Sequence, residues 1–255
     1  MKKAIIIMKK DIKEIRTSFQ IFGTMIATPA LLTGIALVTF GILFAIIPNP
    51  IDLYSILYGA GNILPMYNLM FLIIPVVLPT YIAADSFVGE KVRKTIEALL
   101  VAPISDNELL LGKVLVSLIP TLLFSYLFIG VYIIGINILQ LVNYGAIVFI
   151  FPDLGFILGC LLHIPLLCII TIEIMVIISL KVKGIREAQQ IGGVVVIPVI
   201  SFMFLPFAGL NLYSLSNPLN IFLFTLITLI FCLLAISFYF LSLKVFKRSN
   251  IIVKI

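Results

Sequence analysis

Long uninterrupted stretches of apolar residues occur six times along this 255-residue sequence. A helix needs about 20 mainly apolar residues to cross about 30 Å of hydrocarbon, and it satisfies its own backbone hydrogen bonds within that length. The alternation of apolar and polar residues that marks the strands of an outer-membrane barrel is absent from the sequence. We therefore expect an all-α membrane protein, a bundle of six transmembrane helices. The predicted spans are Gly23–Ile47, Asn62–Ala84, Gly112–Leu139, Leu154–Leu180, Ile191–Tyr213 and Leu219–Val245.

The proportion of charged residues favours the same class. Only 11% of the residues are charged and 62% are hydrophobic, whereas a soluble domain carries about 25% charged residues. All three cysteines fall inside predicted spans, which favours a packing role over a disulfide framework. Prolines inside the second and fifth runs, among them Pro75, Pro79 and Pro198, predict that those two helices bend or break.

The positions of lysine and arginine predict the orientation. All 17 lie before the first run, between or at the edges of the second and third, between the fourth and fifth, or at the end of the sixth and beyond it. The alternate connections carry none, and basic residues collect on the cytoplasmic side of a membrane. We expect a multi-pass protein of the cytoplasmic (plasma) membrane with both termini in the cytoplasm. The net charge of +6 then reflects topology and attraction to the anionic lipid bilayer, and nucleic-acid binding is not expected.

The ends of the apolar runs divide the chain into three parts. Residues 1–22 are expected to form an amphipathic helix on the inner membrane surface, with lysines away from its apolar face. Residues 23–246 form the transmembrane domain, and residues 247–255 form a cytoplasmic tail. The apolar residues at helical spacing in the first part are Met8, Ile12, Ile15, Phe19 and Phe22.

The longest polar segment, residues 85–112, joins the second and third spans. Two pairs of opposite charges stand four residues apart in it and predict a helix over Gly89–Leu100 with a solvated charged face. A cytoplasmic helix displayed between two spans suits docking to a partner. The charge pairs are Glu90 with Lys94 and Arg93 with Glu97.

Local signals end this helix and begin the next. Pro103 is expected to stop the first helix. Ser105 and Glu108 form an S-x-x-E capping box, which predicts the start of the third membrane helix.

The segment Glu90–Lys113 reads E-K-V-R-K-T-I-E-A-L-L-V-A-P-I-S-D-N-E-L-L-L-G-K. It closely resembles the corresponding loop of ABC-2 type transporter permeases. The second inner loop, residues 181–190, contains R-E-A-Q-Q and is similar to the shorter inner loop of that family. The six spans, the inner termini and the N-terminal helix are similar too, so the resemblance covers nearly the whole chain.

The resemblance implies a permease subunit, a homodimer or a dimer with a paralogous permease, that works with two copies of a separate ABC ATPase subunit. ATP and Mg would be bound by that partner, and no cofactor by this chain. Family members export lipids, glycans, peptides, drugs or ions, so the substrate stays open. The helix between spans two and three would be a coupling helix in a cleft of the ATPase. The implied contacts are Glu90, Arg93, Lys94, Thr95, Glu97 and Leu100, with lesser contacts at Arg186 and Glu187.

The sequence lacks the residues of an ATP site. No G-x-x-x-x-G-K-[ST] phosphate loop occurs, so we expect the chain to be a transport subunit and not itself an enzyme.

Two ionisable residues fall inside the fourth span. Glu173 and His163 are candidates for the substrate path, because ionisable groups in a membrane usually face protein or water. The alternatives are a structural hydrogen bond or a vestibule wall for Glu173, and for His163 a bond to a backbone carbonyl freed near Pro165. The two residues lack the H-E-x-x-H spacing of a zinc protease, so no metal site is expected.

Three other classes compete with the permease interpretation. The leading alternative is a stand-alone secondary transporter or channel, which the absence of an internal repeat and of many intramembrane charges disfavours. An intramembrane enzyme would need a nucleophile and base or a metal cluster. A membrane scaffold that only recruits a cytoplasmic protein would bind a partner without stimulating ATP turnover.

Overall fold

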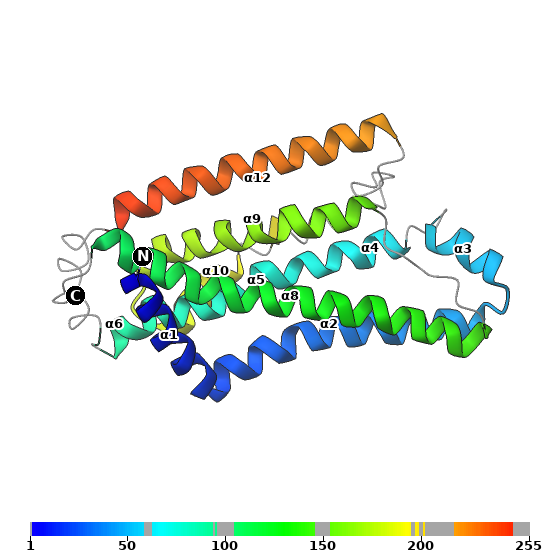
Figure 1. The fold of residues 1–255 in the computed structure, drawn as a ribbon, viewed down its shortest axis with the longest axis horizontal. Coiled ribbons are helices and arrows are strands. Elements are labelled where there is room, and N and C mark those ends of the chain that lie inside the picture. Colours follow the sequence, from blue (N-terminus) through cyan, green and yellow to red (C-terminus); the bar gives the residue numbers. More distant parts are fainter. Residues whose placement is uncertain are drawn as a thin grey trace.

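The computed structural model describes residues 2–58, 63–93, 95, 105–145, 154–194, 197–198, 201 and 217–246. All regular elements in these residues are helices, and the longest run side by side (Figure 1). The elements are α1 (Lys2–Thr17), α2 (Phe19–Ile46), α3 (Pro50–Tyr58), α4 (Ile63–Met70), η1 (Phe71–Ile73), α5 (Ile74–Ala83), η2 (Ala84–Gly89), α6 (Glu90–Val92), α8 (Asp106–Tyr144), α9 (Leu154–Ser179), α10 (Ile185–Gly193) and α12 (Pro218–Val245).

Five stretches of helix in the described residues are long and apolar enough to cross a membrane. The predicted class, an all-helical membrane protein, is therefore confirmed for this part of the chain. The predicted fifth span, Ile191–Tyr213, falls mostly on residues outside the described ones, so the number of six is not tested. The five spans are Ile21–Ile46, Ile63–Val92, Asp106–Tyr144, Leu154–Ser179 and Pro218–Val245.

The second span changes its helix type along its length, as its prolines predict. A 3₁₀ turn, η1, separates α4 from α5 and ends two residues before Pro75, which has no N–H to donate to a carbonyl four residues earlier. Beyond α5 the chain widens into a π-helical turn, η2, before the short α6. Such turns often occur at functional sites.

Aromatic packing holds the centre of the bundle. Phe40 of α2 lies 5.2 Å from Tyr67 of α4 and 6.1 Å from Tyr132 of α8, measured between ring centroids. Tyr132 also lies 4.5 Å from Phe71, and the side chains of Phe40, Phe71 and Tyr132 are almost fully buried. These contacts join α2, α8 and the broken second span into one core.

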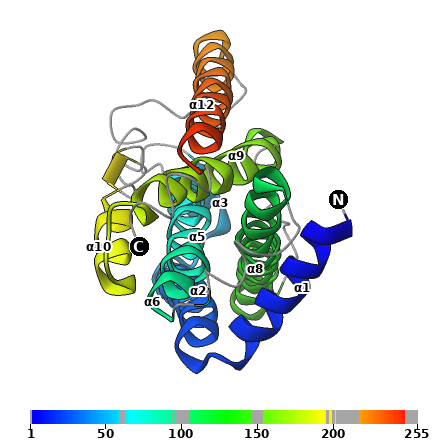
Figure 2. The ribbon, with the colours of Figure 1, turned by 90° about the vertical axis from the view of Figure 1, so that its left-hand side faces the viewer.

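The last helix stands to one side of this core. Seen along the bundle, α12 packs against α9 and extends away from the other helices (Figure 2). Only 11% of its most apolar window is buried. Most of its surface is therefore available to lipid or to another protein.

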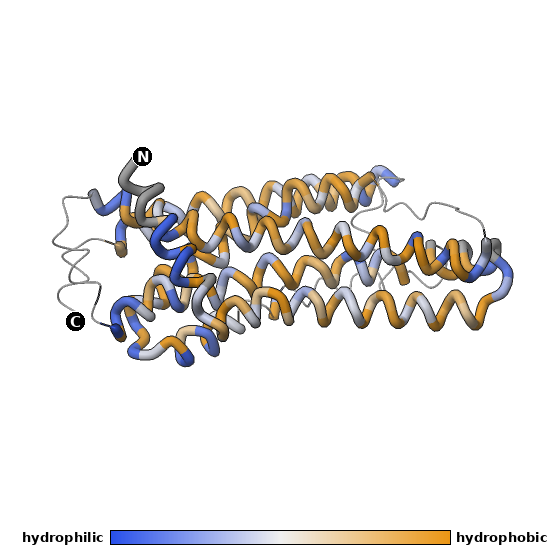
Figure 3. The backbone as a smooth tube through the Cα atoms, turned by 60° about the horizontal axis from the view of Figure 1, so that its bottom comes forward, coloured by the Kyte–Doolittle hydropathy of each residue, from blue (hydrophilic) through white to orange (hydrophobic). Residues whose placement is uncertain are grey.

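One end of the bundle is polar. Hydrophilic backbone positions gather at the end of the bundle that carries α1, η2, α6 and α10, whereas the long helices are apolar along most of their length (Figure 3). We call this region the polar end.

The N-terminal helix ends earlier than the expected boundary at residue 22. α1 ends at Thr17, and Ser18 has extended backbone angles, φ −80° and ψ 103°, which turn the chain into α2. Phe19 therefore belongs to α2 and is 92% exposed instead of lying on the buried face of α1. The face of α1 that packs toward α8 carries Asp11 as well as Ile15, both buried.

Candidate functional site: a charge cluster at the polar end

Charged side chains from three separate parts of the chain meet at the polar end. They come from α1, from the η2–α6 turn and from the first turns of α8, and we call them the charge cluster. Its members lie on both sides of residues 94–104 in the sequence, the middle of the predicted coupling segment. Its members are the charged residues Lys10, Asp11, Glu14, Asp85, Glu90, Arg93 and Lys113, together with the neutral Ser86 that binds Asp11.

Glu90 and Lys113 form the buried centre of the cluster. Lys113 Nζ lies 2.5 Å from Glu90 Oε2. The Lys113 side chain is 1% exposed and the Glu90 side chain is 4% exposed. Lys113 also donates to the backbone carbonyl of Ser86, and its ammonium lies 5.2 Å from the ring centroid of Phe87. The expectation that Glu90 lies on a solvated face is therefore wrong. Its carboxylate faces a lysine 23 residues ahead in the sequence and not solvent.

Arg93 joins α1 to the η2–α6 turn at the edge of the cluster. Its guanidinium donates to the Glu14 carboxylate through Nη1 and to the Asp85 carboxylate through Nη2. A planar guanidinium with several donors suits such a bridge, which a lysine ammonium cannot reproduce in the same geometry. Gly89 leaves room for it, because a Cβ at Gly89 would lie 2.9 Å from Asp85 Oδ1 and 3.0 Å from Arg93 Nη2.

Asp11 contributes a buried carboxylate from α1. The Ser86 hydroxyl donates to its Oδ2 at 3.4 Å, while its Oδ1 has no hydrogen-bond partner among the described residues. Burial raises the pKa of Asp11 above the ordinary value, because removal from water disfavours the charged form, and the nearby positive charge of Lys113 only partly opposes this effect. Lys10 Nζ lies 3.8 Å from the same Oδ1 and 3.6 Å from Glu90 Oε1.

A small cavity lies inside the cluster. It is about 10 Å³ in volume, roughly the size of one water molecule, and residues of α1, η2 and α6 line it. The described residues contain no group of three or more His, Cys, Asp or Glu side chains with the geometry of a metal site.

The second predicted docking loop packs beside the first. α10 contacts η2, α5 and α9, and Ala188 and Gly192 are its buried residues. A Cβ at Gly192 would lie 2.7 Å from Met175 Sδ, so the glycine permits this close approach. Arg186 and Glu187 are exposed, and the Glu187 carboxylate accepts a hydrogen bond from the Lys183 backbone at 3.0 Å.

The remaining predicted contacts divide between described and undescribed residues. Thr95 is exposed, and its backbone N–H donates to the Glu90 carbonyl at 3.0 Å. Lys94, Glu97 and Leu100 lie outside the described residues, so the predicted Glu90–Lys94 and Arg93–Glu97 pairs and the helix beyond Val92 are not tested.

The predicted capping box is confirmed. Ser105 is the N-cap of α8, and its Oγ accepts a hydrogen bond from the Glu108 backbone N–H at 3.3 Å. The capping box therefore fixes the start of α8, directly after residue 104.

The two intramembrane candidates lie apart from the cluster, in α9. His163 Nε2 is 2.8 Å from Thr228 Oγ1, and its ring lies 5.0 Å from the Phe224 ring, centroid to centroid. Glu173 is 1% exposed, and its Oε2 has no hydrogen-bond partner among the described residues. The structure links His163 of α9 to α12, and a role of either residue in a substrate path stays a prediction.

Of the eight members of the cluster, sequence reasoning identified only Glu90 and Arg93. The six that were not among the expected site residues are Lys10, Asp11, Glu14, Asp85, Ser86 and Lys113. One signal was available: Asp11 falls between Met8 and Ile15 on the apolar face of α1, where an acidic residue needs a partner.

The geometry defines an all-helical membrane protein with a buried charge cluster at one end. No protein-family model matches the chain, and no curated protein sequence does either.

Proposed function

We propose that this chain is the permease subunit of an ABC-2 type transporter, with six spans and the polar end in the cytoplasm. A separate ABC ATPase docks on the segment 85–112 and binds ATP and Mg, and the permease exports its substrate across the cytoplasmic membrane. The resemblance of Glu90–Lys113 to the family loop and the distribution of basic residues support this proposal.

The charge cluster is the structural observation that carries the proposal. The described residues on either side of 94–104 are both held in place, Arg93 by two carboxylates and Ser105 by its bond to the first turn of α8. The Glu90–Lys113 pair joins those two sides internally. A force applied to residues 94–104 therefore acts on α1, on the second span and on α8 together.

This arrangement suits energy transfer from a partner. A partner shifts a conformational equilibrium only if it contacts the two states differently. The docking segment is attached to three helices, so a rearrangement of the partner that moves this segment favours one arrangement of the bundle. α10 packs against η2 and presents Arg186 and Glu187 beside the same region, which supports a second contact for the same partner.

Co-purification with an ATPase tests the proposal. The tagged chain is isolated from its native membrane in mild detergent, its stoichiometric partners are identified, and ATP hydrolysis is measured. We expect a nucleotide-binding subunit at one copy per permease chain. The docking variant combines Arg186→Glu with Leu100→Asp, and we expect it to lose both the ATPase and the turnover while still inserting in the membrane.

A matched control separates docking from general charge effects. Lys244→Glu also reverses a positive charge, at an exposed residue in the last turn of α12 that belongs to neither docking loop. This variant should still co-purify with the ATPase subunit and hydrolyse ATP at the wild-type rate. If the wild-type chain carries no ATPase, the proposal fails, and ion flux in liposomes would then identify a stand-alone transporter or channel.

A further inference from the structure

We infer that the outward face of α1 binds the headgroups of anionic phospholipids, with Lys9 and Lys13 as the phosphate-contacting residues. This inference goes beyond the proposed transport function and does not depend on the partner ATPase. It requires only that α1 lies at the membrane boundary.

The position of α1 satisfies that requirement. The first span begins at Ile21, and a single extended residue, Ser18, separates α1 from the helix that contains this span. α1 therefore lies at the end of the hydrocarbon region, and it crosses the polar end at a steep angle to α2 (Figures 1 and 2).

The charges of α1 are segregated between its two faces. Asp11 and Glu14 turn toward the bundle, where Ser86 and Arg93 bind them. Lys9 and Lys13 are exposed, and neither forms an ion pair within the described part of the chain. The acidic residues of α1 are therefore engaged on the inner face, and the outer face presents positive charge alone.

The spacing of the two lysines suits a shared ligand. Residues four apart on a helix lie on the same face, so both ammonium groups reach one phosphate or two adjacent ones. Each lysine near an anionic membrane surface contributes attraction that salt screens.

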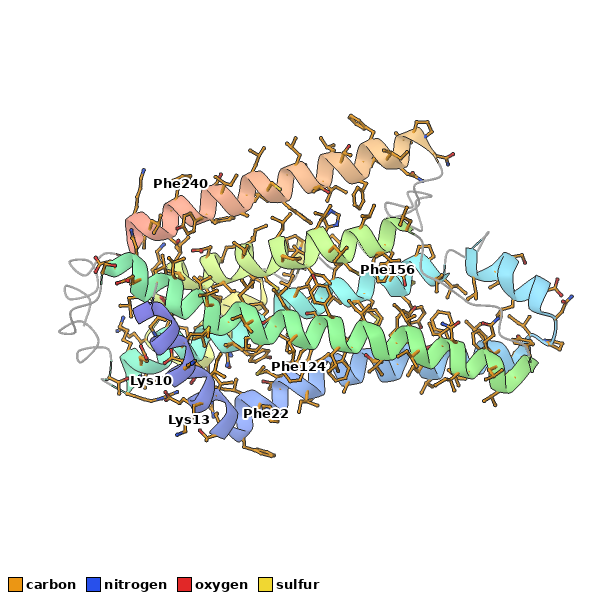
Figure 4. All side chains as sticks on the ribbon, viewed as in Figure 1. Lys10, Lys13, Phe22, Phe124, Phe156 and Phe240 are labelled. Carbon is orange, nitrogen blue, oxygen red and sulfur yellow. The ribbon has the colours of Figure 1, made fainter. Side chains whose placement is uncertain are left out.

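An exposed aromatic pair adjoins this basic face. Phe19 is 92% exposed and Phe22 is 39% exposed at the start of α2. Lys10 and Lys13 of α1 and Phe22 of α2 lie at the same corner of the molecule (Figure 4). Basic residues beside exposed aromatic residues are typical of helices that lie in a membrane interface, where the rings enter the acyl boundary and the ammonium groups contact headgroups.

The sequence contains no tryptophan, so a single introduced tryptophan reports on one position alone. The experiment places the full chain with Phe19→Trp in vesicles of phosphatidylcholine and phosphatidylglycerol, with bromine on the acyl chains of one lipid at a time. Bromine quenches tryptophan fluorescence at contact distance. We expect brominated phosphatidylglycerol to quench the tryptophan more strongly than its mole fraction in the vesicle would predict. At low ionic strength, each lysine should raise the preference for phosphatidylglycerol over phosphatidylcholine about fivefold.

Two variants decide the outcome. Lys9→Gln with Lys13→Gln should abolish the preference, and so should an ionic strength near 1 M, where the screening length falls to about 3 Å. Phe222→Trp is the positional control, because this residue is 61% exposed near the start of α12, at the far end of the bundle (Figure 1). It should show no preference. Equal quenching by both lipids at Phe19→Trp, or a preference that survives in the double glutamine variant, would overturn the inference.

Discussion

Lys113 of α8 donates to the carboxylate of Glu90 in α6, and both side chains are almost fully buried. The pair joins the two ends of the predicted docking segment within the protein. A buried ion pair contributes little net stability compared with apolar residues of the same shape, whereas loss of one partner leaves an uncompensated charge. The pair is therefore a sensitive position for substitution.

Lys113→Met should destabilise the protein strongly. The variant leaves the Glu90 carboxylate buried without its cation, at a cost of about 3–5 kcal/mol. We expect a large fall in melting temperature in detergent, and a substantial recovery when Glu90→Leu is added. Lys10→Met is the control, because Lys10 is half exposed and pairs only at longer distance, so it should change stability by no more than about 1 kcal/mol. If the double variant is no more stable than Lys113→Met, the unpaired Glu90 charge is not the cause of the destabilisation.

Gly89→Ala should be coupled energetically to Arg93. Alanine is better than glycine inside a helix by about 0.5–1 kcal/mol. In the wild-type protein the new Cβ also obstructs the Asp85–Arg93 contact. We expect the substitution to be more favourable, by about 0.5–2 kcal/mol, in an Arg93→Ala background than in the wild type. A double-mutant cycle on melting temperatures measures this difference, and strict additivity would argue against the bridge.

Asp11→Asn should change the pH dependence of stability. The pKa of Asp11 is raised in the folded protein, so the folded chain binds more protons than the unfolded chain, and ionisation of Asp11 lowers stability as pH rises through that window. Asparagine removes the charge and retains an oxygen for the Ser86 hydroxyl. We expect the variant to melt above the wild type near pH 8, with the difference shrinking as pH falls toward the ordinary aspartate pKa of about 4.

The control for this experiment is Asp52→Asn, an exposed aspartate of α3, away from the charge cluster. It should follow the wild-type curve at every pH. An Asp11→Asn variant that melts below the wild type near pH 8 would show that the ionised form is the one the fold favours.

Thr228→Val should loosen the contact between α9 and α12. The substitution preserves shape and removes the hydroxyl that lies 2.8 Å from His163 Nε2. Interhelical hydrogen bonds in membrane proteins contribute about 0.6 kcal/mol on average and up to about 1.7 kcal/mol. Thr225→Val is the matched control, since Thr225 is exposed and its hydroxyl donates to the Phe222 carbonyl of its own helix. Equal melting temperatures for the two variants would show that the His163–Thr228 hydrogen bond does not stabilise the packing of α9 on α12.

Features encoded in short stretches of sequence were predictable. Apolar length predicted the described spans, Pro75 predicted a break in the second one, and the S-x-x-E pattern at Ser105 predicted the start of α8. In each case the physical cause acts within one helical turn or along one continuous run. Neighbours in the sequence therefore contain all of the necessary information.

The charge cluster depends on residues far apart in the sequence. Charge spacing within one helical turn gave no indication that the Glu90 carboxylate faces Lys113, which comes 23 residues later in α8. Asp11 was not expected on the packed face of α1, because the residues that receive it, such as Ser86, come from the second span. No local rule specifies which charges the packing of three helices will bring together.

The peripheral position of α12 has a consequence for biogenesis. Among the described helices α9 is its main neighbour, and a contact of Phe246 with Phe87 of η2, with ring centroids 5.8 Å apart, adds a second attachment at the polar end. The buried core that contains Phe40 and Tyr132 also includes Phe224 of α12. α12 is the last of the described helices to leave the ribosome, so this core is complete only after α12 has packed against α9.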